Sequence, residues 1–249
     1  MPAELFRQLR RAEAQLERAF HDAPPALADR RRSLRLDLLR QHLAFGYHSL
    51  KARHVEGASG QESVQAHAGF IDDFLRQLFR LSVEDCRRAG FGPARFVLVA
   101  LGGYGRGELH PSSDIDIMVI YEGEMTPSVQ RITQEILYTL WDLGLQVGHS
   151  CRSLPDCLAI ARTDFPSRTS MQEARYLAGD KRLFQRVQKV LRENLYRKDF
   201  AQFLETTLAE REQRYRKYGA SPYIGEPNVK ESAGGLRDVH TAMWLASSK

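Results

Sequence analysis

The stretch that decides the fold runs from Arg95 to Tyr121 and reads Arg95-Phe-Val-Leu-Val-Ala-Leu-Gly-Gly-Tyr-Gly-Arg-Gly-Glu-Leu-His-Pro-Ser-Ser-Asp-Ile-Asp-Ile-Met-Val-Ile-Tyr121. Both ends are short apolar runs rich in β-branched residues, which is typical of buried strands. Between them lies a glycine loop, residues 102–107, and the second run opens with Asp114 and Asp116. Because residues two apart on a strand point to the same face, we expect both carboxylates to project together beside this loop.

This arrangement suits a site that holds a divalent metal against a phosphate chain. Hard oxygen ligands suit Mg²⁺, and glycine amides can approach phosphate oxygens closely. We therefore expect Asp114 and Asp116 to be catalytic metal ligands for Mg²⁺, with Mn²⁺ as a substitute. The plainer interpretation of Asp-x-Asp is a turn cap followed by a solvent-facing acid, and the combined spacing of strand, glycines and acids argues against it.

The order of these residues resembles the active-site signature of the nucleotidyltransferase superfamily typified by DNA polymerase beta, in which a Gly-Gly or Gly-Ser loop precedes Asp-x-Asp. More narrowly, residues 102–116 resemble the N-terminal region of the bacterial bifunctional PII-protein uridylyltransferase/uridylyl-removing enzymes. A second block, Glu226-Pro-Asn-Val-Lys-Glu-Ser-Ala-Gly-Gly-Leu-Arg-Asp-Val-His240, resembles a segment that follows the catalytic domain in that family. The resemblance covers most of residues 95–246.

Resemblance and hydrophobic periodicity together predict an α+β fold. We expect a polymerase-beta-like nucleotidyltransferase core, made of a small mixed sheet with flanking helices, with helical regions before and after it. The expected parts are an N-terminal helical region (1–92), the nucleotidyltransferase core (93–163) and a helical subdomain (164–249) that we expect to be truncated at its C-terminal end. The expected helices span about 3–20, 26–55, 63–89, 126–143, 154–161, 165–178, 180–195 and 198–218, and the expected strands span about 95–101, 115–121 and 145–151.

Several residues of the two blocks are candidates for binding the nucleotide. Gly102 and Gly103 would present backbone amides to the β- and γ-phosphates, and Ser113 lies next to the acidic pair. Arg106 is placed for a charge-assisted contact with the same oxygens, or else it is a surface arginine paired with Glu108. The resemblance adds Lys230 and Arg237 from the second block, which otherwise serve helix capping and packing.

The superfamily usually supplies a third carboxylate from a neighbouring strand, and here residues 145–151 contain none. Gly148-His149-Ser150 is usual in the uridylyltransferase branch, so activity is still expected. His149 is our candidate for orienting the acceptor or acting as its base, with a histidine packed at the sheet edge as the alternative. Trp141 and Trp244, at helical positions, are expected to be core residues.

Composition narrows the classes of protein that this chain can be. No apolar run has the length of a membrane span, the N-terminus lacks the apolar core of a signal peptide, and the three cysteines indicate neither a disulfide framework nor a zinc site. We expect a cytoplasmic protein without a membrane partner. The net charge of +5 suits an anion such as a nucleotide and is too weak to indicate nucleic acid.

The resemblance implies transfer of UMP from UTP to a tyrosine hydroxyl of a PII-type nitrogen-regulatory protein, with release of pyrophosphate. In the family, a uridylyl-removing HD domain and glutamine-sensing ACT domains follow, and we expect none of them in this chain. Two alternatives stay open: adenylylation of another protein, and a catalytically silent nucleotide-binding regulatory module, which the missing third acid would favour.

Overall fold

The computed structural model describes residues 24–196, 198–219 and 228–248, together with Arg11 and Glu226. Two compact units divide the chain: unit 1 comprises Met1–Arg152 and Glu173–Lys181, and unit 2 comprises Ser153–Gln172 and Arg182–Lys249. The division into three parts that the sequence indicates stays a prediction. Apart from Arg11, the helix expected over residues 3–20 lies outside the described residues.

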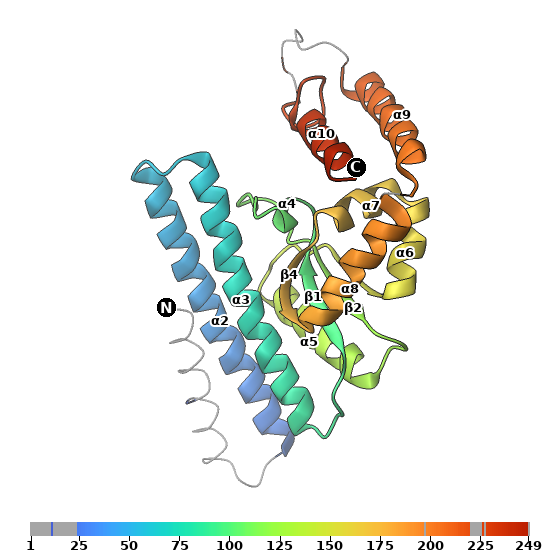
Figure 1. Ribbon diagram of the computed structural model, residues 1–249. Coiled ribbons are helices and arrows are strands. Elements are labelled where there is room, and N and C mark those ends of the chain that lie inside the picture. Colours follow the sequence, from blue (N-terminus) through green and yellow to red (C-terminus); the bar gives the residue numbers. More distant parts are fainter. Residues whose placement is uncertain (1–10, 12–23, 197, 220–225, 227, 249) are drawn as a thin grey trace. The chain divides into compact units, whose positions relative to one another are not determined.

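Two long helices form one wall of unit 1. Helices α2 (Pro24–Val55) and α3 (Gly60–Arg88) run side by side in opposite directions (Figure 1), close to the bounds expected from their apolar stripes. At the start of α3, the Ser59 side chain accepts from the amide of Glu62, and the Glu62 carboxylate accepts from the amide of Ser59. This reciprocal capping box satisfies two amides that a helix start would otherwise leave unpaired.

The sheet has four strands in the order β3-β2-β1-β4. Their bounds are β1 (Phe96–Ala100), β2 (Ile117–Tyr121), β3 (His149–Ser153) and β4 (Arg175–Gly179). Strand β1 pairs antiparallel with both β2 and β4. The amides of Ile115 and Ile117 donate to the carbonyls of Gln146 and Gly148, both over 2.9 Å. Because these positions advance together, β2 and β3 run parallel, and the expected mixed sheet is confirmed.

The core of unit 1 lies between this sheet and helices α3 and α5 (Pro127–Asp142). Alternate residues of the two central strands face it: Phe96, Leu98, Ala100, Ile117 and Val119. The intervening residues are also buried, so β1 and β2 are apolar on both faces, as their unbroken runs indicate. Helix α5 starts where expected, with Thr126 as its N-cap and Pro127 in its first turn.

One expected helix is wrong in its second half. The helix predicted over residues 165–178 ends as α7 (Phe165–Gln172), and Arg175–Gly179 forms strand β4. Glutamate, alanine, arginine and leucine in this stretch favour a helix locally, but pairing with the free edge of β1 outweighs that preference. The chain thus returns from unit 2 to complete the sheet of unit 1.

Unit 2 is helical in its described residues. Besides α7 it contains α6 (Leu154–Thr163), α8 (Lys181–Leu191), the short π-helix η1 (Arg192–Tyr196), α9 (Phe200–Tyr218) and α10 (Leu236–Ser248). Trp244 of α10 is buried against Phe165, which confirms its expected place in a core. The α+β fold class is confirmed. Within the described residues, no helix combines the length and the apolar character needed to span a membrane.

Candidate active site

The two predicted metal ligands project from one face of the chain. Asp114 and Asp116 are exposed, whereas Ile115 and Ile117 between and after them are buried. The two acids directly precede β2, and the amide of Leu101 donates to the carbonyl of Asp116 over 2.9 Å. The backbone that carries the acids is therefore fixed to the residue that opens the glycine loop.

Asp116 lies beside two glycines that leave room for its carboxylate. A methyl group added to Gly148, its neighbour across the β2–β3 pairing, would come within 2.1 Å of Oδ1. A methyl group added to Gly102 would lie 3.7 Å from Oδ2. The Asp116 carboxylate is thus placed between the start of the glycine loop and the neighbouring strand, and a side chain at position 148 would displace it.

The acidic pair fits a hard divalent cation as a partial ligand set. Within the described part of the chain, Asp114 has neither an ion pair nor a side-chain hydrogen bond, and no group of three or more His, Cys, Asp or Glu residues gathers to hold a metal. Mg²⁺ keeps several waters and is commonly bound by one or two carboxylates together with substrate phosphates. Two carboxylates beside a glycine loop match that donor chemistry.

The glycine loop begins with a single helical turn, α4 (Gly102–Gly105). The amides of Gly105 and Arg106 donate to the carbonyls of Leu101 and Gly102, and the amides of Gly102 and Gly103 have no acceptor within the turn. A methyl group on Gly105 would come within 2.3 Å of the carbonyl of Glu173. The segment before β4 therefore packs against the loop at its backbone, which only glycine permits.

Arg106 forms the pair with Glu108 that was the alternative prediction, and it also pairs with a second carboxylate, that of Glu173. Its Nε donates to Glu108 over 2.8 Å, and its Nη1 donates over 2.7 Å to Glu173, whose side chain is 9% exposed. Burial lowers the pKa of the guanidinium, but the two carboxylates outweigh this and raise it. The remaining nitrogen, Nη2, lies over Gly103. Contact of Arg106 with a phosphate stays a prediction, as does a role for Ser113, which is exposed and donates its amide to His110.

His149 points away from the aspartates. It shares the face of Val147 and Cys151, which pack against the core that includes α5, and its ring contacts Trp141 of that helix at 5.4 Å. His149 is exposed at the sheet edge, and its catalytic role stays a prediction. Trp141 itself is 44% exposed, so the expectation of a core residue was wrong there. Its position near the last turn of α5 places it at the edge of the sheet.

Lys230 and Arg237 lie together in unit 2, at the start of α10. The amide of Arg237 donates to the carbonyl of Lys230 over 2.9 Å. The Arg237 guanidinium lies over the Trp244 ring and donates to Glu231 over 3.4 Å. These are the packing contacts of the alternative interpretation, and binding of the triphosphate by either residue stays a prediction.

Three charged residues that contact the glycine loop region were missed: Asp72 of α3, Glu173, and Arg175 of β4. Asp72 had a sequence signal, because it interrupts a stripe of apolar residues on α3 that includes Ala68, Leu75 and Phe79. Glu173 and Arg175 had none, since their stretch was expected to be helical.

Comparison with known proteins supports both motif blocks. A DUF294 nucleotidyltransferase family model matches residues 48–150, which include the glycine loop, the acidic pair and His149. A family model described as GlnD PII-uridylyltransferase matches residues 202–248, which include Lys230 and Arg237.

Curated relatives named bifunctional uridylyltransferase/uridylyl-removing enzyme match along most of the chain. The protein of Caulobacter vibrioides is 41% identical over 218 residues, 86% of this chain and 23% of the relative. That of Phenylobacterium zucineum is 38% identical over 231 residues, 92% of this chain and 24% of the relative. The chain thus spans about a quarter of the length of the relatives it matches. The family recognised in the sequence is confirmed: this chain is homologous to the nucleotidyltransferase region of the bifunctional uridylyltransferase/uridylyl-removing enzymes.

Proposed function

We propose that this chain is a metal-dependent uridylyltransferase that moves UMP from UTP to a tyrosine hydroxyl of a PII-type nitrogen-regulatory protein in the cytoplasm, releasing pyrophosphate. The observation that carries the proposal is the placement of the Asp116 carboxylate between Gly102 and Gly148, with Asp114 on the same face. The names of the relatives support UTP as the donor and a PII-type protein as the acceptor.

The residues of unit 1 divide the chemistry between them. The amides of Gly102 and Gly103, which have no acceptor within the α4 turn, and the Nη2 group of Arg106, which lies near Gly103, would donate to phosphate oxygens of the bound triphosphate. Asp114 and Asp116 would hold Mg²⁺ or Mn²⁺ next to those oxygens. When bound, such a cation neutralises charge on the leaving pyrophosphate and favours the ionised acceptor hydroxyl.

The test is transfer of label from α-labelled UTP to a purified PII-type protein with Mg²⁺ present. Wild-type chain is compared with an Asp114→Asn/Asp116→Asn double variant and with Asp37→Asn, which removes an exposed carboxylate on α2. We expect label from the wild type and from Asp37→Asn, and none from the double variant. Equal labelling by the double variant would overturn the metal assignment.

Substrate identity needs a second arm with all four nucleoside triphosphates. Transfer from ATP in preference to UTP would favour the adenylyltransferase alternative. If UTP binds with an affinity that does not depend on Mg²⁺ and no label reaches any acceptor, the silent regulatory module would be favoured.

A further inference from the structure

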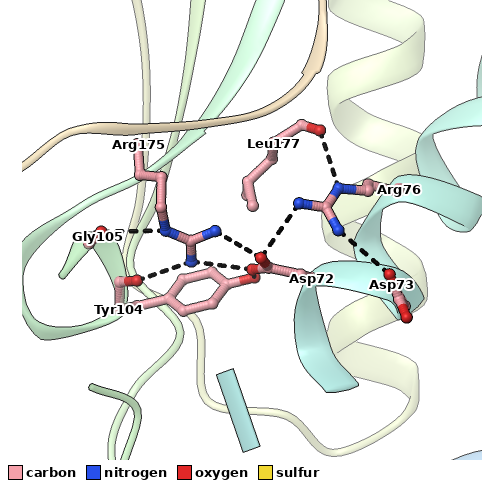
Figure 2. Close-up of polar contacts among 7 residues, drawn as sticks. All are labelled: Asp72, Asp73, Arg76, Tyr104, Gly105, Arg175 and Leu177. Carbon is pink, nitrogen blue, oxygen red and sulfur yellow. Dashed lines mark hydrogen bonds and ion pairs between the residues drawn. The ribbon is translucent and has the colours of Figure 1, made fainter. Parts of the chain in front are cut away.

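Asp72 is a buried carboxylate at the centre of a polar cluster in unit 1 (Figure 2). It lies on the face of α3 that packs against the core, where a charge is costly unless it is paired. The hydroxyl of Tyr104, from the glycine loop, donates to its Oδ1 over 2.7 Å. Arg76, one turn further along α3, donates to its Oδ2 over 3.2 Å. Helix and loop are thus joined through one carboxylate.

Arg175 of β4 completes the cluster and connects it to the loop backbone. Two of its nitrogens donate to the two oxygens of Asp72 in a bidentate pair. Its Nη2 also donates to the carbonyl of Tyr104 over 3.0 Å, and its Nε donates to the carbonyl of Gly105 over 3.1 Å (Figure 2). These carbonyls belong to the end of the α4 turn, where no amide of the helix itself donates to them. The Tyr104 carbonyl also accepts from the amide of Gly107 over 3.0 Å.

The geometry requires a guanidinium. Its planar fork supplies several donors in fixed directions, so one side chain can grip a carboxylate and two backbone carbonyls at once. A lysine at this position would keep the positive charge but could not reproduce the four contacts. Burial lowers the pKa of Arg175, but the Asp72 carboxylate outweighs this and raises it. Burial also raises the pKa of the Tyr104 hydroxyl well above its usual value, so it remains a donor.

We propose that Arg175, clamped to Asp72, is the positioning residue that fixes the glycine loop for the triphosphate. It holds the carbonyls of Tyr104 and Gly105, and thereby the orientation of the turn whose first amides belong to Gly102 and Gly103. This inference rests on the proposed function, because it assigns the loop to the nucleotide.

The test compares Arg175→Lys and Tyr104→Phe with the control Arg35→Lys. Arg35 is a buried arginine, whereas Arg175 is partly exposed, and Arg35 pairs with Asp85 over 2.7 Å between α2 and α3. Asp85 lies about 20 Å from Asp72 along α3 at 1.5 Å per residue. Tyr104→Phe removes one hydroxyl and keeps the ion pair, so it yields folded protein even if the arginine variant does not. Each variant is measured for its unfolding midpoint, hydrogen exchange of residues 102–107, and the KM and kcat for UTP.

For Arg175→Lys we expect faster exchange of the loop amides and a KM for UTP raised about tenfold or more. Tyr104→Phe should raise the KM about threefold, and Arg35→Lys should lower the midpoint while leaving loop exchange and KM unchanged. If Arg175→Lys and Tyr104→Phe behave like the control, the positioning role is wrong. If wild-type chain binds no UTP while Arg175→Lys still speeds loop exchange, the proposed function fails but the clamp on the loop is supported.

Discussion

Asp72 and Asp114 are two carboxylates of unit 1 in opposite states. Asp72 is buried and accepts hydrogen bonds from Tyr104, Arg76 and Arg175. Asp114 is exposed, and no partner for it occurs within the described residues. A buried carboxylate destabilises the fold unless it is paired. An exposed carboxylate stays hydrated, so it needs no protein partner and can bind a cation. Asp72 therefore holds the residues around the glycine loop in place, whereas Asp114 is accessible to a ligand.

The largest effect should come from Asp114→Asn. Loss of one metal ligand should reduce uridylyl transfer about a thousandfold or more, because metal charge stabilisation contributes several kcal/mol. Stability should not fall, since the change removes an exposed charge next to Asp116 and breaks no described contact. Transfer assays and urea unfolding measure the two quantities. A marked loss of stability would show that Asp114, like Asp72, stabilises the fold.

The reverse pattern is expected for Asp72→Asn. Arg175 and Arg76 would lose the carboxylate that they share, so the free energy of unfolding should fall by about 2–3 kcal/mol. Chemical denaturation measures this, with Asp37→Asn on α2 as a control that should stay within about 0.5 kcal/mol of wild type. An Asp72→Asn protein as stable as wild type would break the distinction between the two acids.

Gly148→Ala tests whether the open space around Asp116 matters. The new methyl group would meet Oδ1 at 2.1 Å, so the carboxylate must turn away and transfer should fall about tenfold to a hundredfold. Gly69→Ala in α3 is the matched control, because a methyl group there meets nothing and should stabilise the helix by about 1 kcal/mol. Unchanged transfer in Gly148→Ala would show that Asp116 acts from another position.

The smallest expected effect is the pH dependence of stability that His67 causes; this residue binds the backbone just after the glycine loop. His67 of α3 donates from Nδ1 to the carbonyl of Leu109 over 3.0 Å, and its buried Nε2 has no partner among the described residues. Burial lowers the pKa of His67, opposed by the Leu109 carbonyl and reinforced by His110, and the Tyr47 ring also packs against it. The neutral form is therefore the native one.

Because the folded pKa of His67 lies below the unfolded value of 6.5, its contribution to stability is complete above that pH. The contribution is lost as the pH falls from 6.5 through the folded pKa. Urea unfolding at pH 7.5 and pH 5.5 should show a decrease of about 1 kcal/mol. His67→Gln should reduce this decrease without abolishing it, since burial also lowers the pKa of His42. An equal pH dependence in the variant would exclude His67 as the source.

Much of the fold could be predicted because its signals are local. The apolar runs that became β1 and β2, the helix stop at Gly90 and the Thr126-Pro127 helix start all act within a few residues. Strand β4 could not be predicted, because Arg175–Gly179 becomes a strand only by pairing with β1, whose residues lie far away in the sequence. Local propensity carries no information about such a partner.

In the candidate site, too, local patterns could be predicted and contacts with distant residues could not. Alternation along a strand placed Asp114 and Asp116 on one face, and the spacing of glycines and acids predicted their neighbourhood. Gly148 lies beside Asp116, so the next residue, His149, points to the opposite face of the sheet. This could not be predicted without knowing that Asp116 and Gly148 are neighbours. The ion pair of Arg106 with Glu173 could not be predicted, because Glu173 comes from the stretch expected to be helical.

The path of the chain limits how this protein can be divided. It leaves unit 1 after Arg152, returns for Glu173–Lys181 and leaves again, so three peptide links connect the two units. A fragment ending at Arg152 would expose one edge of β1 and lack both Glu173 and Arg175. A chain nicked by a protease between residues 152 and 153 should stay associated through the backbone pairing of β1 with β4. For the same reason, a single genetic crossover cannot exchange one unit intact, because the sheet of unit 1 is encoded on both sides of a unit 2 segment.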